Sequence, residues 1–282
     1  MGRSVTVAAP AKLNLALAVT GKRADGYHDL VSIFATIDLV DDIRVAPHKS
    51  LEVRNTLDIG PGEDLAARAV RALAAELKRE PHAFVHIRKR IPLAAGLGGG
   101  SSDAAAVLRA LATLWKVDAD LVRLAASVGS DVPFFASGAS VALVSGRGEN
   151  IEALPKPREP LHVVVLRPPV RLATAEVFAE LRPEEMGQRA HVDALARAFR
   201  AGTVTPETLH IHAHNDLLTA AQRRCEAIVS WRTAAAARGI ALALTGSGPT
   251  LFAVADDRRD ALRIARILRR AGLNAHSHVL AA

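Results

Sequence analysis

The strongest constraint on this chain is a glycine-rich run at residues 92–104, which reads PLAAGLGGGSSDA. Four of the five residues 96–100 are glycine, and glycine loses more conformational freedom on folding than any other residue. Such a run is useful where backbone N–H groups must approach another group closely. A helix is predicted to follow at about residues 102–115, with Ser101 or Ser102 as its N-terminal cap. Because the unpaired N–H groups at a helix start attract anions, the run predicts a phosphate-binding loop.

The run matches neither of two common phosphate-binding motifs. No Gly-Lys-Ser or Gly-Lys-Thr follows the glycines, as a Walker A loop requires. The dinucleotide fingerprint needs a third glycine where Ser101 stands, and an acidic residue about 20 positions later at the end of a strand. The acidic residues found there, Asp118 and Asp120, open a predicted helix instead, which disfavours a dinucleotide-dependent oxidoreductase. A flexible surface loop before a capped helix is the alternative to phosphate binding.

Length and composition predict a large α+β protein with two lobes. The chain has 282 residues, of which 50% are hydrophobic and 23% are charged, so a sizeable core is expected. Strands dominate the first third, and strands and helices then mix without the regular alternation of a parallel α/β fold. Residues 154–160 hold three prolines and are the predicted linker. The predicted lobes are therefore residues 1–155 and 156–282.

Hydrophobic periodicity places the individual elements. Alternation of leucine with polar or small residues predicts a strand over residues 11–18. Further strands are predicted at 28–37, 42–46, 83–91, 140–145, 161–166, 241–244, 251–255 and 275–280. Apolar residues at helical spacing predict helices at 65–78, 102–115, 119–128, 192–200, 216–238 and 257–271. Cys225, the only cysteine, falls in a predicted helix and is expected to be a buried, unreactive thiol. A single cysteine excludes an internal disulfide.

Lys12 and Asp131 are the candidate catalytic residues. Lys12 shares the polar face of its predicted strand with Asn14, where a lone lysine is usually solvated. Asp131 stands between a small-residue turn and Pro133, where an aspartate often only caps a turn. Beside a phosphate loop, however, these two residue types equip a site for phosphoryl transfer. The aspartate would position or deprotonate a hydroxyl group, and the lysine would offset negative charge.

Two further runs have both a structural and a functional interpretation. Residues 245–250, which read TGSGPT, are either a hairpin turn or a second glycine loop that closes the anion site. Tyr27, the only tyrosine, precedes His28. This pair would stack on and hydrogen-bond a nucleobase, or it would simply belong to a surface loop.

The charge balance favours anionic partners. Lys and Arg outnumber Asp and Glu by 36 to 29, which gives a net charge of +7. An aromatic content of 4% weakens the case for stacking on single-stranded nucleic acid, although a basic RNA-binding protein is one alternative. The histidines at 210, 212 and 214 alternate as metal ligands can, but they precede a predicted helix start and their spacing is expected to be incidental. No stretch reaches the ~18 apolar residues of a membrane span, and with the single cysteine this predicts a cytoplasmic protein.

Taken in order, these runs resemble three motifs of the GHMP kinase superfamily. Residues 10–15, which read PAKLNL, resemble its first motif, residues 92–104 its phosphate-loop motif, and residues 244–250 its third. The resemblance implies an ATP-dependent kinase that uses magnesium and has a two-lobed α+β fold. Its N-terminal lobe, residues 1–155, would bind the nucleotide and be similar to a ribosomal-protein fold. Its α/β C-terminal lobe, residues 156–282, would complete the substrate site.

Three runs narrow the resemblance: residues 26–28 (GYH), 98–102 (GGGSS) and 131–134 (DVPF). They resemble the subfamily that phosphorylates the 2-hydroxyl of a cytidine diphosphate-linked methylerythritol in the non-mevalonate route to isoprenoids. By this resemblance Asp131 is the catalytic base, and Lys12 holds Asp131 ionised and orients the hydroxyl. Tyr27 and His28 would bind cytosine, with Phe178 as a second stacking aromatic.

The resemblance also implies two sets of binding residues. The nucleotide would be bound by Pro92, Leu93, Ala94, Ala95, Gly96, Leu97, Gly98, Gly99, Gly100, Ser101, Ser102 and Asp64. The substrate would be bound by Asn14, Tyr27, His28, Thr174, Phe178, Gly246, Ser247 and Gly248. Asp64 stands where the subfamily often has asparagine, which leaves the selectivity for adenine open. The magnesium ligands are not assigned, with Ser102 and Asp103 as the nearest candidates.

The main alternative is another GHMP kinase that acts on a mevalonate-like, homoserine-like or sugar acceptor. The Tyr27-His28 pair favours a cytidine-linked acceptor, because an acceptor without a base needs no stacking pair. The expected partner is therefore the small-molecule cytidine diphosphate substrate, with neither nucleic acid nor membrane. The expected assembly is a monomer or a weak homodimer.

Overall fold

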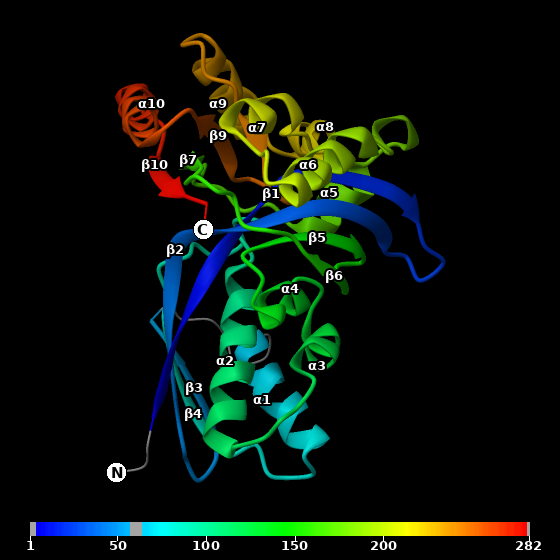
Figure 1. The fold of residues 1–282 in the computed structure, drawn as a ribbon, viewed down its shortest axis with the longest axis vertical. Helices are drawn as coiled ribbons and strands as arrows, with labels where there is room; N and C mark the ends of the chain where they lie inside the picture. Colours follow the sequence, from blue (N-terminus) through cyan, green and yellow to red (C-terminus); the bar gives the residue numbers. More distant parts are fainter. Residues whose placement is uncertain (1–3, 57–63, 281–282) are drawn as a thin grey trace.

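The computed structural model describes residues 4–56 and 64–280. Within these residues the strands form two sheets, and helices cover both of them (Figure 1). Two long antiparallel strands, β1 (Val5–Lys22) and β2 (His28–Ala46), run from the lower part of the molecule into the upper part. Their pairing shifts between Pro10 and Lys12, between Asn14 and Ala16 and between Val19 and Gly21. These bulges change which side chains face the interior along β1.

The six-stranded sheet has the order β3-β4-β2-β5-β6, and β1 pairs with β2 off this path. Its other strands are β3 (Leu51–Asn55), β4 (Ala83–Arg88), β5 (Val141–Gly146) and β6 (Asn150–Ala153). β3 and β4 are parallel, and the chain between them forms α1 (Leu65–Glu76). A crossover helix is the usual way to connect parallel neighbours.

Helices α1, α2 and α4 pack on this sheet, α3 packs against these three helices, and together they build the first core. The others are α2 (Gly99–Trp115), α3 (Leu121–Val128) and α4 (Val132–Ser137). Alanines of α2 are completely buried against the sheet, together with Phe34 of β2 and Phe134 of α4. Small side chains let the helix backbone approach the strands closely. α2 is therefore held deep in the lobe, with its first turn at one end of the sheet.

The second sheet has the order β10-β7-β9-β8. Its strands are β7 (His162–Leu166), β8 (Ala243–Leu244), β9 (Leu251–Ala255) and β10 (Ala275–Val279). The helices of this lobe are α5 (Thr174–Glu180), α6 (Arg189–Ala201), α7 (Pro206–His212), α8 (Leu218–Arg224), α9 (Glu226–Ala236) and α10 (Arg258–Arg270). These elements form the upper part of the molecule in Figure 1.

The two-lobed α+β fold predicted from the sequence is confirmed. The extended segment between β6 and β7 contains the predicted linker. Core residues nevertheless cross the predicted boundary, because Leu17 and Val19 of β1 pack in the C-terminal core. A further buried cluster joins Leu13 and Leu15 of β1 to Phe252 of β9. The boundary at residue 155 stays a prediction.

Three predictions about individual elements were wrong. The predicted strands at 28–37 and 42–46 are one continuous strand, β2. The predicted helix 216–238 is two helices, which Cys225 separates in an extended conformation, although its side chain is buried as expected. α2 begins at Gly99, so Ser101 and Ser102 lie inside its first turn and neither is its cap. The cap position is Gly98, whose φ of +70° favours glycine over a serine cap.

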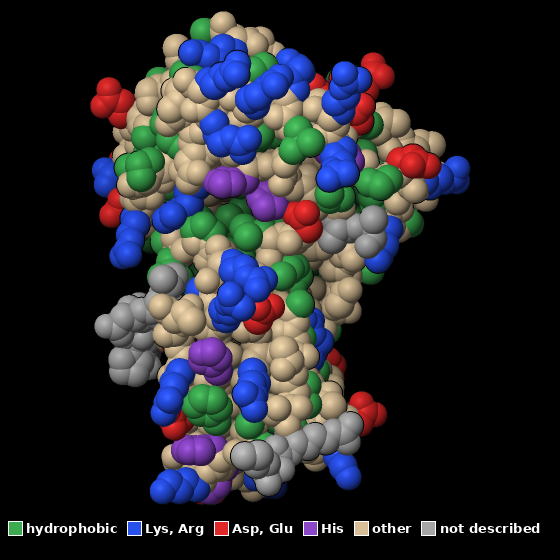
Figure 2. Space-filling model, turned by 90° about the vertical axis from the view of Figure 1, so that its left-hand side faces the viewer, with side chains coloured by type: hydrophobic (Ala, Val, Ile, Leu, Met, Phe, Trp, Pro, Cys, Tyr) green, Lys and Arg blue, Asp and Glu red, His purple; other side chains and the backbone are tan. Residues whose placement is uncertain are grey.

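Basic side chains are spread over the face in Figure 2, with acidic side chains between them, and they gather at its top. α10 carries six of the arginines, and its first and last turns hold Arg258 and Arg270. Among the described helices, none combines the length and the apolar character needed to cross a membrane.

Candidate active site

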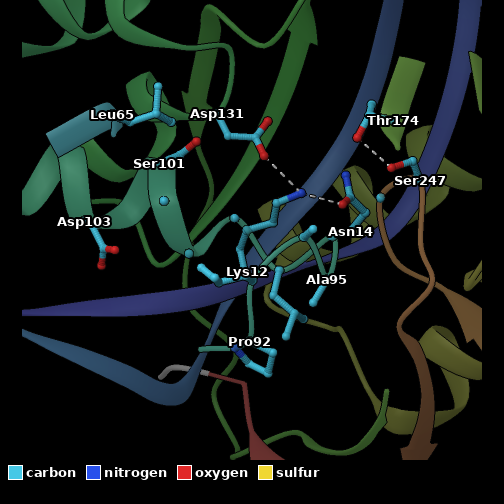
Figure 3. A pocket seen from close by; sticks show the side chains of 18 of the residues that line it. Lys12, Asn14, Leu65, Pro92, Ala95, Ser101, Asp103, Asp131, Thr174 and Ser247 are labelled. Atoms are coloured by element: carbon cyan, nitrogen blue, oxygen red, sulfur yellow. Dashed lines mark hydrogen bonds and ion pairs between the residues drawn. The ribbon is translucent and has the colours of Figure 1, made fainter. Parts of the chain in front are cut away.

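A cavity of about 520 Å³ lies where the phosphate loop, β1, α5 and the loop between β8 and β9 meet. The loop residues that line it are Pro92, Leu93, Ala94, Ala95, Gly96, Leu97, Gly98, Gly99, Gly100 and Ser101. Of the other predicted site residues, it is lined by Lys12, Asn14, Asp64, Asp131, Thr174, Phe178, Gly246 and Ser247. Figure 3 shows side chains from both lobes around this space. Segments far apart in the sequence therefore meet at one site, as the resemblance implied.

The phosphate loop has the geometry of an anion cradle. Gly96 and Gly98 both have positive φ, +73° and +70°, which L side chains rarely adopt. At Gly100 a Cβ atom would meet only Leu65 at 3.8 Å, so the first turn of α2 is open on that side. Ser101 also lines the cavity. The unpaired N–H groups of this first turn and the positive end of the α2 dipole therefore face a space that phosphates can enter.

The two glycine loops contact each other closely. A Cβ atom on Gly96 would lie 2.8 Å from the carbonyl oxygen of Thr245 and 3.1 Å from that of Gly248. A Cβ atom on Gly246 would in turn lie 3.2 Å from the carbonyl oxygen of Gly96. Only glycine permits this approach of one backbone to the other. Residues 245–250 therefore contribute Gly246 and Ser247 to the wall of the cavity and are not merely a hairpin turn.

Lys12 and Asp131 face each other across the cavity. The Lys12 ammonium lies 3.3 Å from Oδ2 of Asp131 and 4.2 Å from the centre of the Phe34 ring. The Lys12 side chain is 4% exposed, whereas that of Asp131 is 31% exposed. The backbone N–H of Lys12 donates to the carbonyl oxygen of Leu97, at 2.9 Å. This bond fixes the lysine relative to the phosphate loop, and the aspartate keeps access to a bound molecule (Figure 3).

Asn14 orients Lys12 through a buried hydrogen-bond network. Its Oδ1 accepts from the Lys12 ammonium at 2.7 Å, and its Nδ2 donates to Ser32 Oγ at 2.9 Å. The Asn14 N–H donates to Thr245 Oγ1, at 2.9 Å. Asn14 thus links β1 to β2 and to the second glycine loop. The predicted polar face of this strand is therefore buried and not solvated, and its residues Lys12 and Asn14 line the cavity.

The second glycine loop is tied to the rest of its lobe at two points. Ser247 Oγ and Thr174 Oγ1 lie 2.9 Å apart (Figure 3). Asn215 Nδ2 donates to the carbonyl oxygens of Leu244 and Gly246, at 3.0 and 2.8 Å. From the sequence, Asn215 is only the residue before a predicted helix. No local pattern indicates that its amide reaches residues about 30 positions away.

The predicted base-binding aromatics lie beside the cavity. The rings of His28 and Phe178 stack with their centres 5.0 Å apart, and Phe178 lines the cavity. Tyr27 is 55% exposed, and the Arg147 guanidinium lies 4.8 Å from its ring centre. Burial and the nearby Lys22 charge lower the pKa of His28. The lower pKa favours the neutral ring, in which one nitrogen donates a hydrogen bond and the other accepts one. Tyr27 and His28 do not themselves line the described cavity.

Three other predicted residues take supporting positions. Ser102 is buried in α2 and does not line the cavity, and its hydroxyl has no partner among the described residues. Gly248 does not line it either, and its N–H closes the turn by donating to Thr245 at 3.0 Å. Asp64 lines the cavity but also caps α1, accepting from the N–H of Ala66. Its carboxylate is therefore partly used before any nucleotide binds.

The alternating histidines lie outside the cavity. His210 is within 3.8 Å of Asp256, and His214 Nε2 is 2.9 Å from Asp216. His212 contacts a further ring, that of His191. In the part of the chain that the structure describes, no group of three or more His, Cys, Asp or Glu residues is arranged to hold a metal ion.

The structure reveals a buried charged cluster that the sequence predictions missed. Lys89 lies 2.5 Å from Asp41 Oδ2 and 2.7 Å from Asp103 Oδ2, and all three side chains are at most 5% exposed. A signal for it existed in the sequence. The alternation that places Val85 and Ile87 inside β4 also places Lys89 inside, and a buried lysine requires a charged partner.

Burial raises the pKa of Asp103 to about 7 from the ordinary 3.8, although Lys89 lowers it. Asp103 is then protonated in the folded chain and ionised in the unfolded chain between these two pH values. The folded state binds more protons there, so stability falls as pH rises from about 4 to 7. We expect Asp103→Asn to be more stable than the unchanged protein at pH 8 but not at pH 4.

Urea unfolding of both proteins at pH 4, 6 and 8 measures this difference directly. The expected result is a free energy of unfolding that falls with pH in the unchanged protein and falls less in Asp103→Asn. Parallel pH profiles of the two proteins would mean that Asp103 does not carry a shifted proton.

The site fits ATP more clearly than it fits a resident metal ion. The open first turn of α2 and the two contacting glycine loops offer backbone donors for phosphate oxygens. Of the acidic residues lining the cavity, Asp103 is paired with Lys89 and points away from Asp131 in Figure 3. Mg²⁺ commonly binds through one or two carboxylates plus substrate phosphates, and a carboxylate such as Asp131 suits that arrangement.

Two family models match the chain. The model described as GHMP kinases N terminal domain matches residues 64–139, and the one described as GHMP kinases C terminal matches residues 206–274. The first match covers the phosphate loop and Asp131, and the second covers the second glycine loop. Lys12 lies outside both matched ranges.

Curated relatives and solved structures extend this similarity to nearly the whole chain. Proteins named 4-diphosphocytidyl-2-C-methyl-D-erythritol kinase from Pelotomaculum thermopropionicum and Streptomyces coelicolor are each 38% identical. The alignments cover 94% and 95% of this chain and 94% and 93% of the relatives. A crystal structure of 4-(cytidine 5'-diphospho)-2C-methyl-D-erythritol kinase has a TM-score of 0.81 at 35% identity, over 99% of this chain and 100% of that one. The homoserine kinase of Cytophaga hutchinsonii shares the fold, with a TM-score of 0.74 at 18% identity over 100% of this chain and 96% of its own.

Proposed function

The chain belongs to the GHMP kinases, and within them to the 4-diphosphocytidyl-2-C-methyl-D-erythritol kinase family, and we propose that it performs that reaction. It transfers the γ-phosphate of ATP to the 2-hydroxyl of 4-diphosphocytidyl-2-C-methyl-D-erythritol, a step of the non-mevalonate route to isoprenoids. The observation that carries the proposal is the Lys12–Asp131 pair, which stands beside an open phosphate loop in a cavity that both lobes line. Its only required partners are small molecules, and the cytoplasm is where we infer that it acts.

Asp131 is the proposed base. Its carboxylate is one-third exposed toward the cavity and accepts the proton of the 2-hydroxyl, whose oxygen attacks the γ-phosphorus as ADP leaves. The Lys12 ammonium, 3.3 Å from the Asp131 carboxylate, orients it and offsets the charge that develops on the transferred group. The proposed transfer is direct, from ATP to the acceptor, without a phosphorylated enzyme intermediate.

The phosphate loop holds ATP in this proposal. N–H groups at the start of α2 bind phosphate oxygens in this proposal. Asp64 and Leu65 line the part of the cavity where the adenine ring would lie. Magnesium would neutralise phosphate charge when it is bound with ATP, and its protein ligands are not assigned. Lys12 is fixed to this loop through Leu97, so the base, the lysine and the phosphate site form one rigid unit.

The proposed acceptor site lies on the other side of Asp131. Thr174 and Ser247 line this part of the cavity. Phe178 lines the cavity as well and also stacks on His28. Cytosine would stack between Tyr27 and Phe178, with His28 hydrogen-bonding its edge. In the structure the His28 ring covers one face of Phe178, so base binding would displace one ring from the other.

We expect Tyr27→Ala to raise KM for the cytidine-linked substrate about tenfold, because stacking on a base contributes ~1–3 kcal/mol. KM for ATP should stay within twofold, since Tyr27 lies outside the loop region. Initial-rate kinetics with each substrate varied in turn measure both constants. Ile211→Ala is the matched control, as Ile211 is also exposed, at 60%, and lies in α7. Equal increases in both KM values would remove Tyr27 from the base site.

The product identifies the reaction. Incubation with ATP, magnesium and 4-diphosphocytidyl-2-C-methyl-D-erythritol should yield ADP and a substrate with one added phosphate. Phosphorus NMR of that product distinguishes a phosphate on the tertiary 2-hydroxyl carbon from one on a neighbouring hydroxyl, because only the latter shows coupling to a carbon-bound hydrogen. Phosphorylation at another hydroxyl would overturn the proposed geometry of Asp131.

A further inference from the structure

A buried ion cluster lies beneath the phosphate loop. Asp41 is a residue of β2 and is completely buried, with its Oδ2 2.5 Å from the Lys89 ammonium. Lys89 follows the last residue of β4 and contacts Asp103 of α2 with the same ammonium. The cluster therefore joins a strand of the central sheet to the helix that the loop enters.

The other carboxylate oxygen of Asp41 holds the segment that enters the loop. Asp41 Oδ1 accepts from the backbone N–H groups of Arg90, at 2.5 Å, and Ile91, at 2.8 Å. Ile91 directly precedes Pro92, the first residue of the loop. Proline has no N–H group of its own and a fixed φ, so these two bonds are the last points where the sheet can fix the chain before the loop.

The segment that leaves the loop is held by the same cluster. A Cβ atom on Gly99, the first residue of α2, would lie 3.3 Å from the Lys89 ammonium and 2.8 Å from Cγ2 of Ile91. Asp103 sits one turn further along and accepts from Lys89 at 2.7 Å. The start of α2 thus rests on the residues that Asp41 fixes. The two ends of the loop cannot move independently.

We propose that Asp41 is a positioning residue for the nucleotide, which fixes both ends of the phosphate loop from beneath without touching the ligand. The inference rests on the proposed function of this loop as the ATP site. Asp41 does not line the cavity, so any effect on ATP must pass through the loop backbone. Misplacing such a loop by about 1 Å can cost about 100-fold in rate.

An amide at position 41 separates the two roles of Asp41. Asparagine has one acceptor oxygen, so it cannot serve the two backbone N–H groups and Lys89 together. Asp42→Asn is the matched control: it makes the same change at the next residue of β2, which does not line the cavity and pairs with the Arg90 side chain at the surface, and Asp41 keeps both backbone bonds. An effect of lost negative charge alone would appear in both variants. A positioning role makes only Asp41→Asn harmful to ATP binding.

The test measures the affinity of a non-hydrolysable ATP analogue by calorimetry, and KM for both substrates, in the unchanged protein and the two variants. We expect Asp41→Asn to weaken the analogue and raise KM for ATP at least tenfold, with KM for the cytidine-linked acceptor within twofold. Asp42→Asn should stay within twofold for both. Equal effects of the two variants, or equal effects on both substrates, would overturn the inference.

Two outcomes keep this test separate from the proposed function. If the unchanged protein binds no ATP analogue, the proposed function fails first, and the inference fails with it. If the unchanged protein binds the analogue and folded Asp41→Asn binds it equally well, only the inference fails. Should Asp41→Asn not fold, Asp41→Glu keeps the negative charge near Lys89 but moves the carboxylate by one methylene group relative to the backbone N–H groups, and should raise KM for ATP at least fivefold. An unchanged KM for ATP in Asp41→Glu would then overturn the inference.

Discussion

Asp131→Asn is expected to lower kcat about 1,000-fold while KM for ATP changes less than threefold. The amide keeps the size of the side chain and can still face Lys12, but it cannot accept the proton of the attacking hydroxyl. General base catalysis of this kind contributes about 10²–10⁴-fold. Asp131 precedes α4 and makes no side-chain cap to it, so the helix loses no capping bond when the carboxylate is replaced. The loss should therefore fall on the chemical step and not on the fold.

Single-turnover kinetics, with the enzyme in excess over ATP, separate the chemical step from product release in this variant. Asp118→Asn is the matched control, because it makes the same change at an exposed position outside the cavity and should leave kcat unchanged. A kcat of Asp131→Asn within tenfold of the unchanged protein would exclude Asp131 as the base, and the reaction would then depend on positioning alone.

Lys12→Met should lower kcat about 100-fold. Methionine fits the buried space beside Phe34, so the fold should persist, but the site loses the ammonium that lies 3.3 Å from Asp131. Loss of a single charge-stabilising donor in an active site typically costs ~10²–10³-fold. Oδ1 of Asn14 loses its contact at 2.7 Å as well, whereas the amide keeps its bonds to Ser32 Oγ and Thr245 Oγ1. Steady-state rates and thermal unfolding of the same preparation measure both effects.

The double variant shows whether the two residues act together. Because Lys12 and Asp131 form one ion pair, adding Lys12→Met to Asp131→Asn should cost much less than 100-fold. Lys156→Met, an exposed lysine of the linker, controls for loss of positive charge and should leave kcat unchanged. Fully multiplicative effects would show that Lys12 and Asp131 contribute independently.

Local sequence signals predicted the parts of the site that depend on neighbouring residues. Consecutive glycines followed by a helix indicate an anion site wherever they occur, and the alternation of leucines around Lys12 indicates its strand. The outcome for Asn14 shows where this reasoning stops. Its place on a strand was predictable, but its role in joining two strands and a loop 231 positions away depends on tertiary packing.

The errors have the same cause. The break at Cys225 and the union of two predicted strands in β2 follow from packing in the two cores, which overrides local propensity. Asp41 is another example. It reads as one acidic residue beside another, Asp42, in a stretch of the chain without a motif. Only the folded chain shows that the first is completely buried under the phosphate loop while the second forms an exposed ion pair with Arg90.

One measurement tests the proposed reaction most directly. A coupled assay monitors ADP release from ATP in the presence of magnesium, with four acceptors compared in parallel. The acceptors are 4-diphosphocytidyl-2-C-methyl-D-erythritol, mevalonate, homoserine and galactose. The account predicts turnover with the first alone, because only that acceptor carries a base for Tyr27, His28 and Phe178. Turnover with another acceptor alone would contradict the assignment of the acceptor site, and no turnover with any of them would contradict the proposed function itself.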